Sequence, residues 1–174
     1  IIILVHSSFN VSLENILISN ALELVHINIK PGMYAAFNVI CFYRPPAANF
    51  NNFIHDFNSL LANLPYQQQS FILLGDINHN LNKINKAQDP ILQFFNGYGI
   101  KPINKKNTRT VISSQSCIDW ILCNSLSLKF VNKHFNLPIA FSDHDCICLI
   151  YKKGRNFINN PPIKHTKFLL NTTV

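Results

Sequence analysis

The stretch FILLGDINHN, at Phe71–Asn80, decides the fold of this chain. Its apolar start, Phe71–Leu74, is typical of a strand that is covered on both faces, and Gly75 ends the run. If the backbone stays extended past the glycine, Asp76 and Asn78 project to the same side, because side chains alternate along a strand. A carboxylate and an amide oxygen at the exit of a buried strand suit a hard cation or a phosphate ester. The stretch therefore predicts a buried strand, and by itself it favours a turn rich in Asp and Asn at the end of that strand over a functional site.

Three further blocks favour a site over a simple turn rich in Asp and Asn. In CFYRPP, proline ends a strand. This leaves Tyr43 and Arg44 at the strand exit, where a hydroxyl and a guanidinium can reach a phosphate. In SCIDWILCN, Asp119 interrupts an apolar strand, and a carboxylate in that position needs a partner or a function. The blocks are CFYRPP at Cys41–Pro46, SCIDWILCN at Ser116–Asn124 and SDHD at Ser142–Asp145.

Taken together, the four blocks resemble the endonuclease/exonuclease/phosphatase superfamily, which includes DNase I and the apurinic/apyrimidinic endonucleases. They occur in the order of that family between Ala21 and Tyr151, and CFYRPP looks like the endonuclease domain of non-LTR retrotransposons. The resemblance implies an α/β fold, a four-layer sandwich of two packed mixed sheets with helices outside. It also implies a DNA endonuclease that uses Mg²⁺ or Mn²⁺, with a reverse transcriptase domain in the full-length chain.

The resemblance implies catalytic roles for residues of all four blocks. Asp76 would orient or deprotonate the attacking water and touch the metal, and Asn78 would hold the phosphate or the nucleophile. Asp143 would be a metal ligand, and Tyr43 would contact the phosphate. The scarcity of acids supports these roles, because four of the eight Asp and Glu residues lie in the blocks.

The Asp-His pair of the last block completes the predicted site. His144 would bond the scissile phosphate, while Asp119 would fix its tautomer and raise its basicity, as a carboxylate does beside a catalytic histidine. Further residues are predicted to contact nucleic acid: Arg44, Lys105, Lys106, Arg109 and Ser142. The lysines and Arg109 lie in an Asn/Thr-rich loop that would otherwise be read as a solvated surface.

The sequence also departs from the family in one respect. Family members take a metal-binding Glu and a phosphate-binding Asn from strands that should precede Ile1, and Glu14 and Glu23 follow the wrong strand to replace that Glu. We therefore expect a piece of a longer protein that holds Mg²⁺ loosely. Its nicking should be far slower than that of a chain extended upstream, and its exposed sheet edge should make it poorly soluble.

Composition places the chain in a basic, globular class. Fifteen Lys and Arg against eight Asp and Glu give a net charge of +7, which suits a polyanionic partner such as DNA. The five cysteines are odd in number and sit mostly in apolar patterns, as expected for buried thiols in a reducing compartment. Without an apolar run of ~20 residues, we expect no membrane partner. From the predicted role in a retrotransposon, we expect the protein to be intracellular and to act in the nucleus.

Local patterns predict the order of elements. An apolar stripe with Asn49 as N-cap and Pro65 as terminator predicts one helix, and Asp89 followed by Pro90 begins a second. His6–Asn20 should be a loop with a short strand at its end. Strands are expected at 1–5, 16–18, 21–28, 34–43, 71–74, 117–123, 128–134 and 145–151. We assign residues 1–151 to one domain and 152–174 to a basic linker or tail.

Two other functions fit the same residues. A phosphoesterase acting on phosphoinositides or sphingomyelin would have the same fold, and net positive charge does not separate lipid from DNA. A decayed, non-catalytic nucleic-acid-binding remnant is the alternative from another class. The absence of the N-terminal acids favours the remnant, whereas the intact blocks favour an enzyme.

Overall fold

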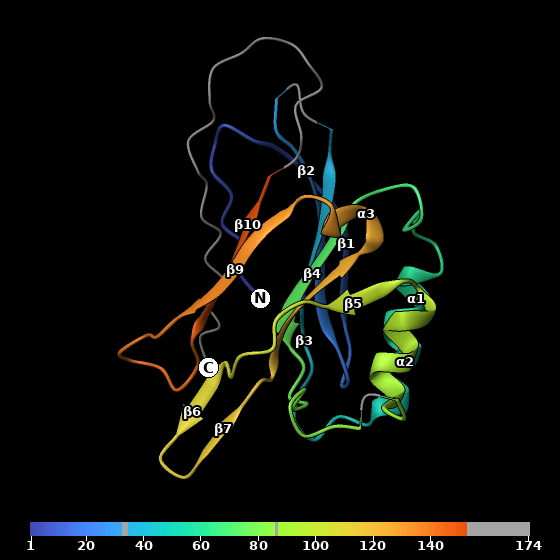
Figure 1. Ribbon diagram of the computed structural model, residues 1–174. Coiled ribbons are helices and arrows are strands. Elements are labelled where there is room, and N and C mark those ends of the chain that lie inside the picture. The colour runs from blue at the N-terminus through green and yellow to red at the C-terminus, as the bar shows by residue number, and fades with distance from the viewer. Residues whose placement is uncertain (33–34, 86, 153–174) are drawn as a thin grey trace.

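A six-stranded mixed sheet forms the centre of the fold (Figure 1). The computed structural model describes residues 1–32, 35–85 and 87–152. Only the β3–β4 pairing is parallel, and the other neighbouring strands of this sheet run antiparallel. In spatial order the strands are β1 (Asn10–Ile18), β2 (Glu23–Lys30), β3 (Phe37–Tyr43), β4 (Phe71–Asp76), β8 (Asp119–Asn124) and β5 (Ile100–Pro102).

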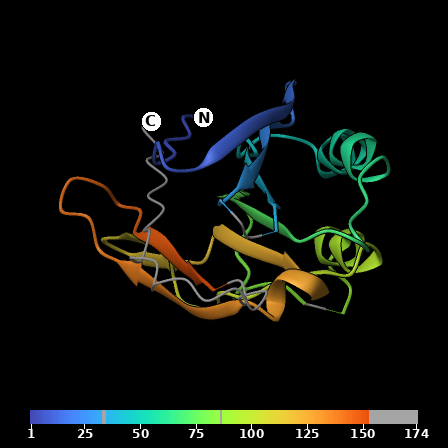
Figure 2. The same cartoon turned by 90° about the horizontal axis from the view of Figure 1, so that it is seen from above.

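Two helices cover one face of this central sheet (Figure 2). They are α1 (Phe50–Leu61) and α2 (Pro90–Gly97). The predicted N-caps are confirmed, because the side chains of Asn49 and Asp89 accept backbone N–H groups of the first helical turns. The Phe57 ring packs edge-on against Phe42 of the sheet and Phe95 of α2, at 5.3 Å between centroids in both pairs. The aromatic stripe is therefore core packing.

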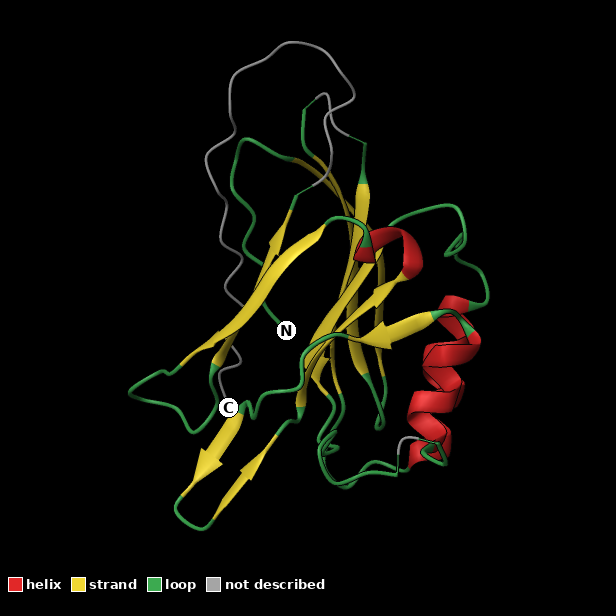
Figure 3. Cartoon of the chain, in the orientation of Figure 1, coloured by secondary structure: helices red, strands yellow, loops and turns green. Residues whose placement is uncertain are grey.

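A second, smaller sheet covers the other face (Figure 3). It consists of β9 (Val131–Leu137) and β10 (Cys146–Tyr151), and the short α3 (Ser125–Leu128) leads into it. A separate ribbon, β6 (Arg109–Val111) with β7 (Ser114–Ser116), projects from one end of the molecule. The α/β class and the packed sheets are confirmed. The second sheet, which we expected to be mixed, is an antiparallel pair within the described residues.

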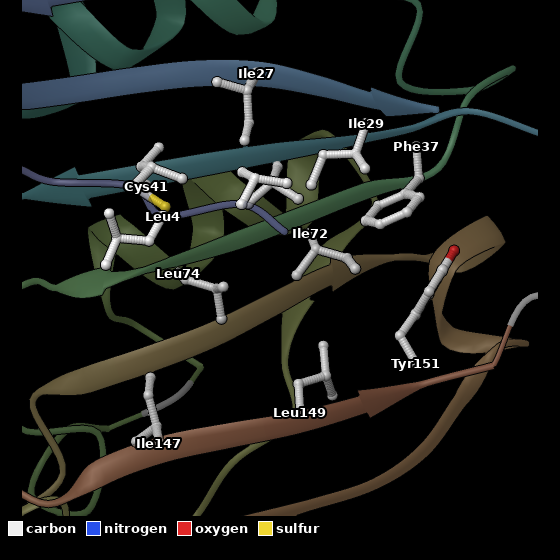
Figure 4. A pocket seen from close by; sticks show the side chains of 13 residues that line it. Leu4, Ile27, Ile29, Phe37, Cys41, Ile72, Leu74, Ile147, Leu149 and Tyr151 are labelled. Atoms are coloured by element: carbon white, nitrogen blue, oxygen red, sulfur yellow. The ribbon is translucent and has the colours of Figure 1, made fainter. Parts of the chain in front are cut away.

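An apolar pocket separates the two sheets (Figure 4). Ile72 and Leu74 of β4 line one side and Leu149 of β10 lines the other. The segment Ile1–Val5, predicted as a buried strand, is not a strand here; Ile3 and Val5 pack against the core beside the pocket, and the segment enters no ladder. Apolar character alone does not distinguish a strand from a covering segment. The pocket is lined by none of the predicted site residues.

The structure also corrects the expectation for the segment that contains β1. We predicted a loop with a short strand at residues 16–18, but the strand runs from Asn10 to Ile18 and pairs with β2 along its length, with a bulge between Leu13 and Asn15. Most of its residues are exposed, and backbone pairing rather than burial holds it. A strand without a buried face lacks the alternation that sequence analysis depends on.

The remaining expectations concern membranes and the C-terminal tail. In the part of the chain that the structure describes, no helix is long and apolar enough to cross a bilayer. The predicted tail, 152–174, lies outside the described residues except for Lys152.

Candidate active site

Strand register brings the predicted acids together. Tyr43 pairs with Asp76 between β3 and β4, and Asp76 pairs with Asp119 between β4 and β8. Because side chains alternate, these three share the sheet face that is directed toward the second sheet. Glu23 continues the row on β2, where it pairs with Tyr43. The row crosses one end of the central sheet.

Gly75 permits the close approach of β3 and β4 next to this row. A Cβ atom at this position would lie 1.9 Å from the backbone oxygen of Phe42, so a side chain has no space there. The strand continues through Asp76, one residue beyond the glycine that we expected to end it.

The backbone turns sharply after Asp76. Asn78 has a φ of 48°, so the extended conformation that we considered for this stretch does not occur. Its backbone N–H donates to Asp76 Oδ1 at 2.7 Å, and its side-chain amide donates to Asp76 Oδ2 at 3.3 Å and to the Arg44 carbonyl at 2.9 Å. Asn78 thus fixes the orientation of the Asp76 carboxylate, and its amide oxygen remains available to a ligand.

His144 reaches the same place from the segment that precedes β10. Its Nδ1 lies 3.0 Å from Asp119 Oδ2 and 3.2 Å from Oδ1, the contact that the sequence predicted. The backbone around His144 is fixed by β6: Thr110 N–H donates to the Asp143 carbonyl at 2.8 Å, and Asp145 N–H donates to the Thr108 carbonyl at 2.7 Å. With Asp119 as partner of Nδ1, Nε2 is the ring nitrogen left for a substrate.

The surroundings of Asp76 and His144 raise the pKa values of both groups. Burial, reinforced by the nearby Asp119 carboxylate, raises the pKa of Asp76 to about 6. The hydrogen bond to Asp119 raises the pKa of His144 above its ordinary value, against the opposing effect of burial. The contact with Asp119 thus favours the charged form of the imidazole, whereas burial and the neighbouring carboxylate disfavour the charged form of Asp76.

Asp76, Asp119 and His144 form a possible cation site. One ligand atom from each lies within 4.8 Å of the others. Two largely buried carboxylates on neighbouring strands repel each other, and a divalent cation between them would relieve that repulsion. The residues present therefore fit a hard divalent ion.

Asp143 does not join this cluster. We predicted it as a metal ligand, but its Oδ2 accepts a hydrogen bond from Arg109 Nε at 2.7 Å, and both side chains are 42% exposed. The guanidinium lowers the pKa of Asp143. In this arrangement Asp143 is an ion-pair partner of Arg109 outside the cluster of Asp76, Asp119 and His144, and its assignment as a metal ligand stays a prediction.

Arg44 requires a further correction. It was predicted to contact nucleic acid, yet it is 3% exposed, and it donates to the carbonyls of Ile77 and Ala48 while its guanidinium lies 4.1 Å from the centroid of the Phe50 ring. A guanidinium held by these backbone groups has no path to a phosphate. Its role is to fasten the turn after β4 to the start of α1.

The other predicted contact residues lie on the accessible side. Lys105 and Lys106 are exposed in the loop between β5 and β6, and Tyr43 is half-buried beside Asp76. Burial and the Asp76 charge raise the pKa of Tyr43, so its hydroxyl stays protonated as a donor. Ser142 is exposed, and its Oγ accepts the His144 backbone N–H at 3.0 Å.

Two buried residues that sequence analysis missed hold Asp119. Thr108 Oγ1 accepts the backbone N–H groups of Ile118 and Asp119, at 3.1 and 3.0 Å. The Asn104 amide donates to the Asp119 carbonyl at 2.7 Å and accepts from Ile121 N–H at 2.8 Å. Both residues hold Asp119 through its backbone, so no pattern of side chains in the sequence reveals them. Glu23, which we excluded as a replacement for the metal-binding Glu of the family, lies in the row because the strand register pairs it with Tyr43.

Comparisons with known proteins agree with this geometry. A family model described as "Endonuclease-reverse transcriptase" matches residues 37–148. The endonuclease domain of TRAS1, a telomere-specific non-LTR retrotransposon, superposes with a TM-score of 0.71 at 15% identity, over 86% of this chain and 72% of that domain.

More distant structures share the fold. The catalytic domain of Xenopus laevis APE2 gives a TM-score of 0.54 at 15% identity, over 76% of this chain and 55% of that domain. An endonuclease/exonuclease/phosphatase family protein from Leptotrichia buccalis gives 0.50 at 13% identity, over 85% and 74%. The chain thus spans about half of the APE2 catalytic domain. A search of curated proteins found no sequence match.

Proposed function

The chain belongs to the endonuclease–reverse transcriptase family, and from this premise we propose that it hydrolyses phosphodiester bonds in DNA with the help of a divalent metal ion. Within a retroelement this activity would nick the target DNA in the nucleus, next to a reverse transcriptase carried by the same polypeptide. The observation that supports the proposal most directly is the contact of His144 with Asp119, at 3.0 Å, beside the buried carboxylate of Asp76.

The metal would be held by the carboxylates of Asp76 and Asp119. We propose Mg²⁺ or Mn²⁺, because both take carboxylate oxygens as ligands. When bound, such an ion neutralises phosphate charge and lowers the pKa of water.

The residues of the chain would perform the remaining tasks. Nε2 of protonated His144 donates a hydrogen bond to a non-bridging phosphate oxygen, and Asp119 keeps the imidazolium charged and oriented. Asp76 accepts a proton from the attacking water. The amide oxygen of Asn78 orients that water, and the Tyr43 hydroxyl donates to the phosphate.

Nicking of a supercoiled plasmid tests the proposal. We expect relaxation with Mg²⁺ or Mn²⁺, none with EDTA, and at least a hundredfold loss in Asp76→Asn and His144→Ala, since each removes a group that acts on the reacting atoms. His55→Ala is the matched control, because His55 also contacts an aspartate, Asp56 at 3.2 Å, but is 84% exposed on α1. Equal activity of all the variants would refute the assigned roles.

DNA binding can be tested separately from cleavage. The exposed Lys105 and Lys106, with Arg109 at the rim, are proposed to contact backbone phosphates. Replacing all three by alanine should reduce the slope of log K against log salt by about three, because each contact contributes about one unit. An unchanged slope would mean that the loop is a solvated surface that does not contact DNA.

The alternatives give different results in the same assays. Metal-dependent release of phosphate or headgroup from phosphoinositide or sphingomyelin vesicles, without plasmid nicking, would favour the lipid phosphoesterase. Salt-dependent DNA binding with no hydrolysis of any phosphodiester would favour the non-catalytic remnant.

A further inference from the structure

Phe141 is exposed at the edge of the candidate active site. Its side chain is 90% accessible, and among the described residues only Ile112 exposes a larger fraction of an apolar side chain. A single exposed apolar residue is common on protein surfaces. The position of Phe141, however, is set by the same short segment that carries His144.

Hydrogen bonds order the turn that presents Phe141. Ser142 N–H donates to the Ile139 carbonyl at 3.3 Å, which closes a turn with Phe141 at its third position. The Ser142 hydroxyl in turn accepts the His144 N–H at 3.0 Å. The phenyl ring is thus displayed on a structured support, and covalent geometry keeps its Cα within about 11 Å of that of His144.

Phe141 has a counterpart on the neighbouring ribbon. Arg109 and His144 form an antiparallel bridge. Counting outward from this bridge along both chains places position 112 opposite position 141, although the ribbon and the loop diverge (Figure 1). Ile112 and Phe141 are both highly exposed, and each lies three positions along the chain from a residue of the Arg109–His144 bridge.

We infer that Phe141 stacks against a DNA base next to the scissile phosphate and partly unstacks that base step. The inference rests on the proposed function. With a rise of about 3.4 Å per step, the distance to His144 spans no more than about three steps, so the ring can reach a base only in the immediate flank of the phosphate. Apolar side chains inserted between bases unstack the step in this way, and stacking on an aromatic ring tolerates any base.

Fluorescence of 2-aminopurine tests the contact without requiring turnover. The nick made by the wild-type chain is mapped, and a duplex carrying 2-aminopurine beside that position is titrated with the His144→Ala variant, which keeps the DNA intact. We expect fluorescence to rise on binding as the base leaves the stack. The rise should be lost in His144→Ala/Phe141→Ala, kept in His144→Ala/Phe141→Trp, and kept in His144→Ala/Leu13→Ala. Leu13, 60% exposed on β1, is the matched apolar control.

Activity supplies a second measurement. In the otherwise wild-type chain, Phe141→Ala should lower kcat/KM for duplex nicking about tenfold, the loss expected for one base–aromatic stack. It should leave hydrolysis of methyl p-nitrophenyl phosphate unchanged, because that diester has no base. Binding with no fluorescence change, or nicking unaffected by Phe141→Ala, would overturn the inference and leave the proposed function standing. Failure of the wild-type chain to cleave any phosphodiester would overturn the proposed function itself.

Discussion

Replacing Asp76 by asparagine should stabilise the metal-free protein while it abolishes hydrolysis. In the folded chain burial and the Asp119 carboxylate raise the pKa of Asp76 from 3.8 to about 6. The unfolded state therefore loses this proton first as pH rises, and folding stability falls between about pH 4 and pH 6. Above pH 6 the penalty is constant and amounts to about 3 kcal/mol. Asparagine does not titrate, and its amide oxygen can still accept the Asn78 N–H.

The assay is urea denaturation of wild type and Asp76→Asn at pH 4 and pH 8, with EDTA throughout. We expect nearly equal unfolding free energies at pH 4 and a gain of about 2–3 kcal/mol for the variant at pH 8, or roughly 4–10 °C in Tm. Added Mg²⁺ should stabilise the wild type and not the variant, because only a bound ligand shifts the equilibrium. A variant that is less stable at pH 8, or a gain that is the same at both pH values, would refute the electrostatic account.

Three substitutions address the supports of the site. Gly75→Ala should lower the unfolding free energy in urea by about 3 kcal/mol, since its Cβ meets the Phe42 carbonyl at 1.9 Å; a wild-type midpoint would mean that β3 and β4 separate without strain. Arg44→Ala should lower stability by about 3 kcal/mol but leave the salt slope of DNA binding unchanged, and a changed slope would restore its predicted phosphate contact. Thr108→Val should cost about 2 kcal/mol and reduce kcat for plasmid nicking more than KM, because the support of Asp119 loses its acceptor; unaltered kcat would show that Asp119 needs no such support.

Local signals in the sequence were sufficient for α1 and α2 and for β2, β3, β4 and β8, whereas α3 and β5 were not predicted. Asn49 and Asp89 are N-caps whose action is confined to one turn, and the apolar run before Gly75 identified β4. β1 was missed because its pairing with β2, and not a buried face, defines it. Ile1–Val5 was assigned as a strand from apolar content that instead covers the pocket between the sheets.

The candidate site likewise contains features that the sequence predicted and features that it did not. The contact between Asp119 and His144 was implied by the resemblance of the blocks to the family, and it is present at 3.0 Å. The positions of Arg44 and Asp143 could not be predicted, because burial against Phe50 and pairing with Arg109 arise only from the tertiary arrangement. The chemical roles stay predictions until the variants are measured.

The row of residues across the central sheet has a consequence for folding. Asp76 is flanked by Tyr43, which precedes it in the chain, and by Asp119, which follows much later, and His144 comes later still. Contacts of such large sequence separation form slowly, because the loops between them must close first. During synthesis from the N-terminus, a nascent chain that has emerged only through β4 exposes Asp76 without its acidic and imidazole partners. We expect DNA-cleaving capacity to appear abruptly, when β10 docks on the sheet and carries His144 into place.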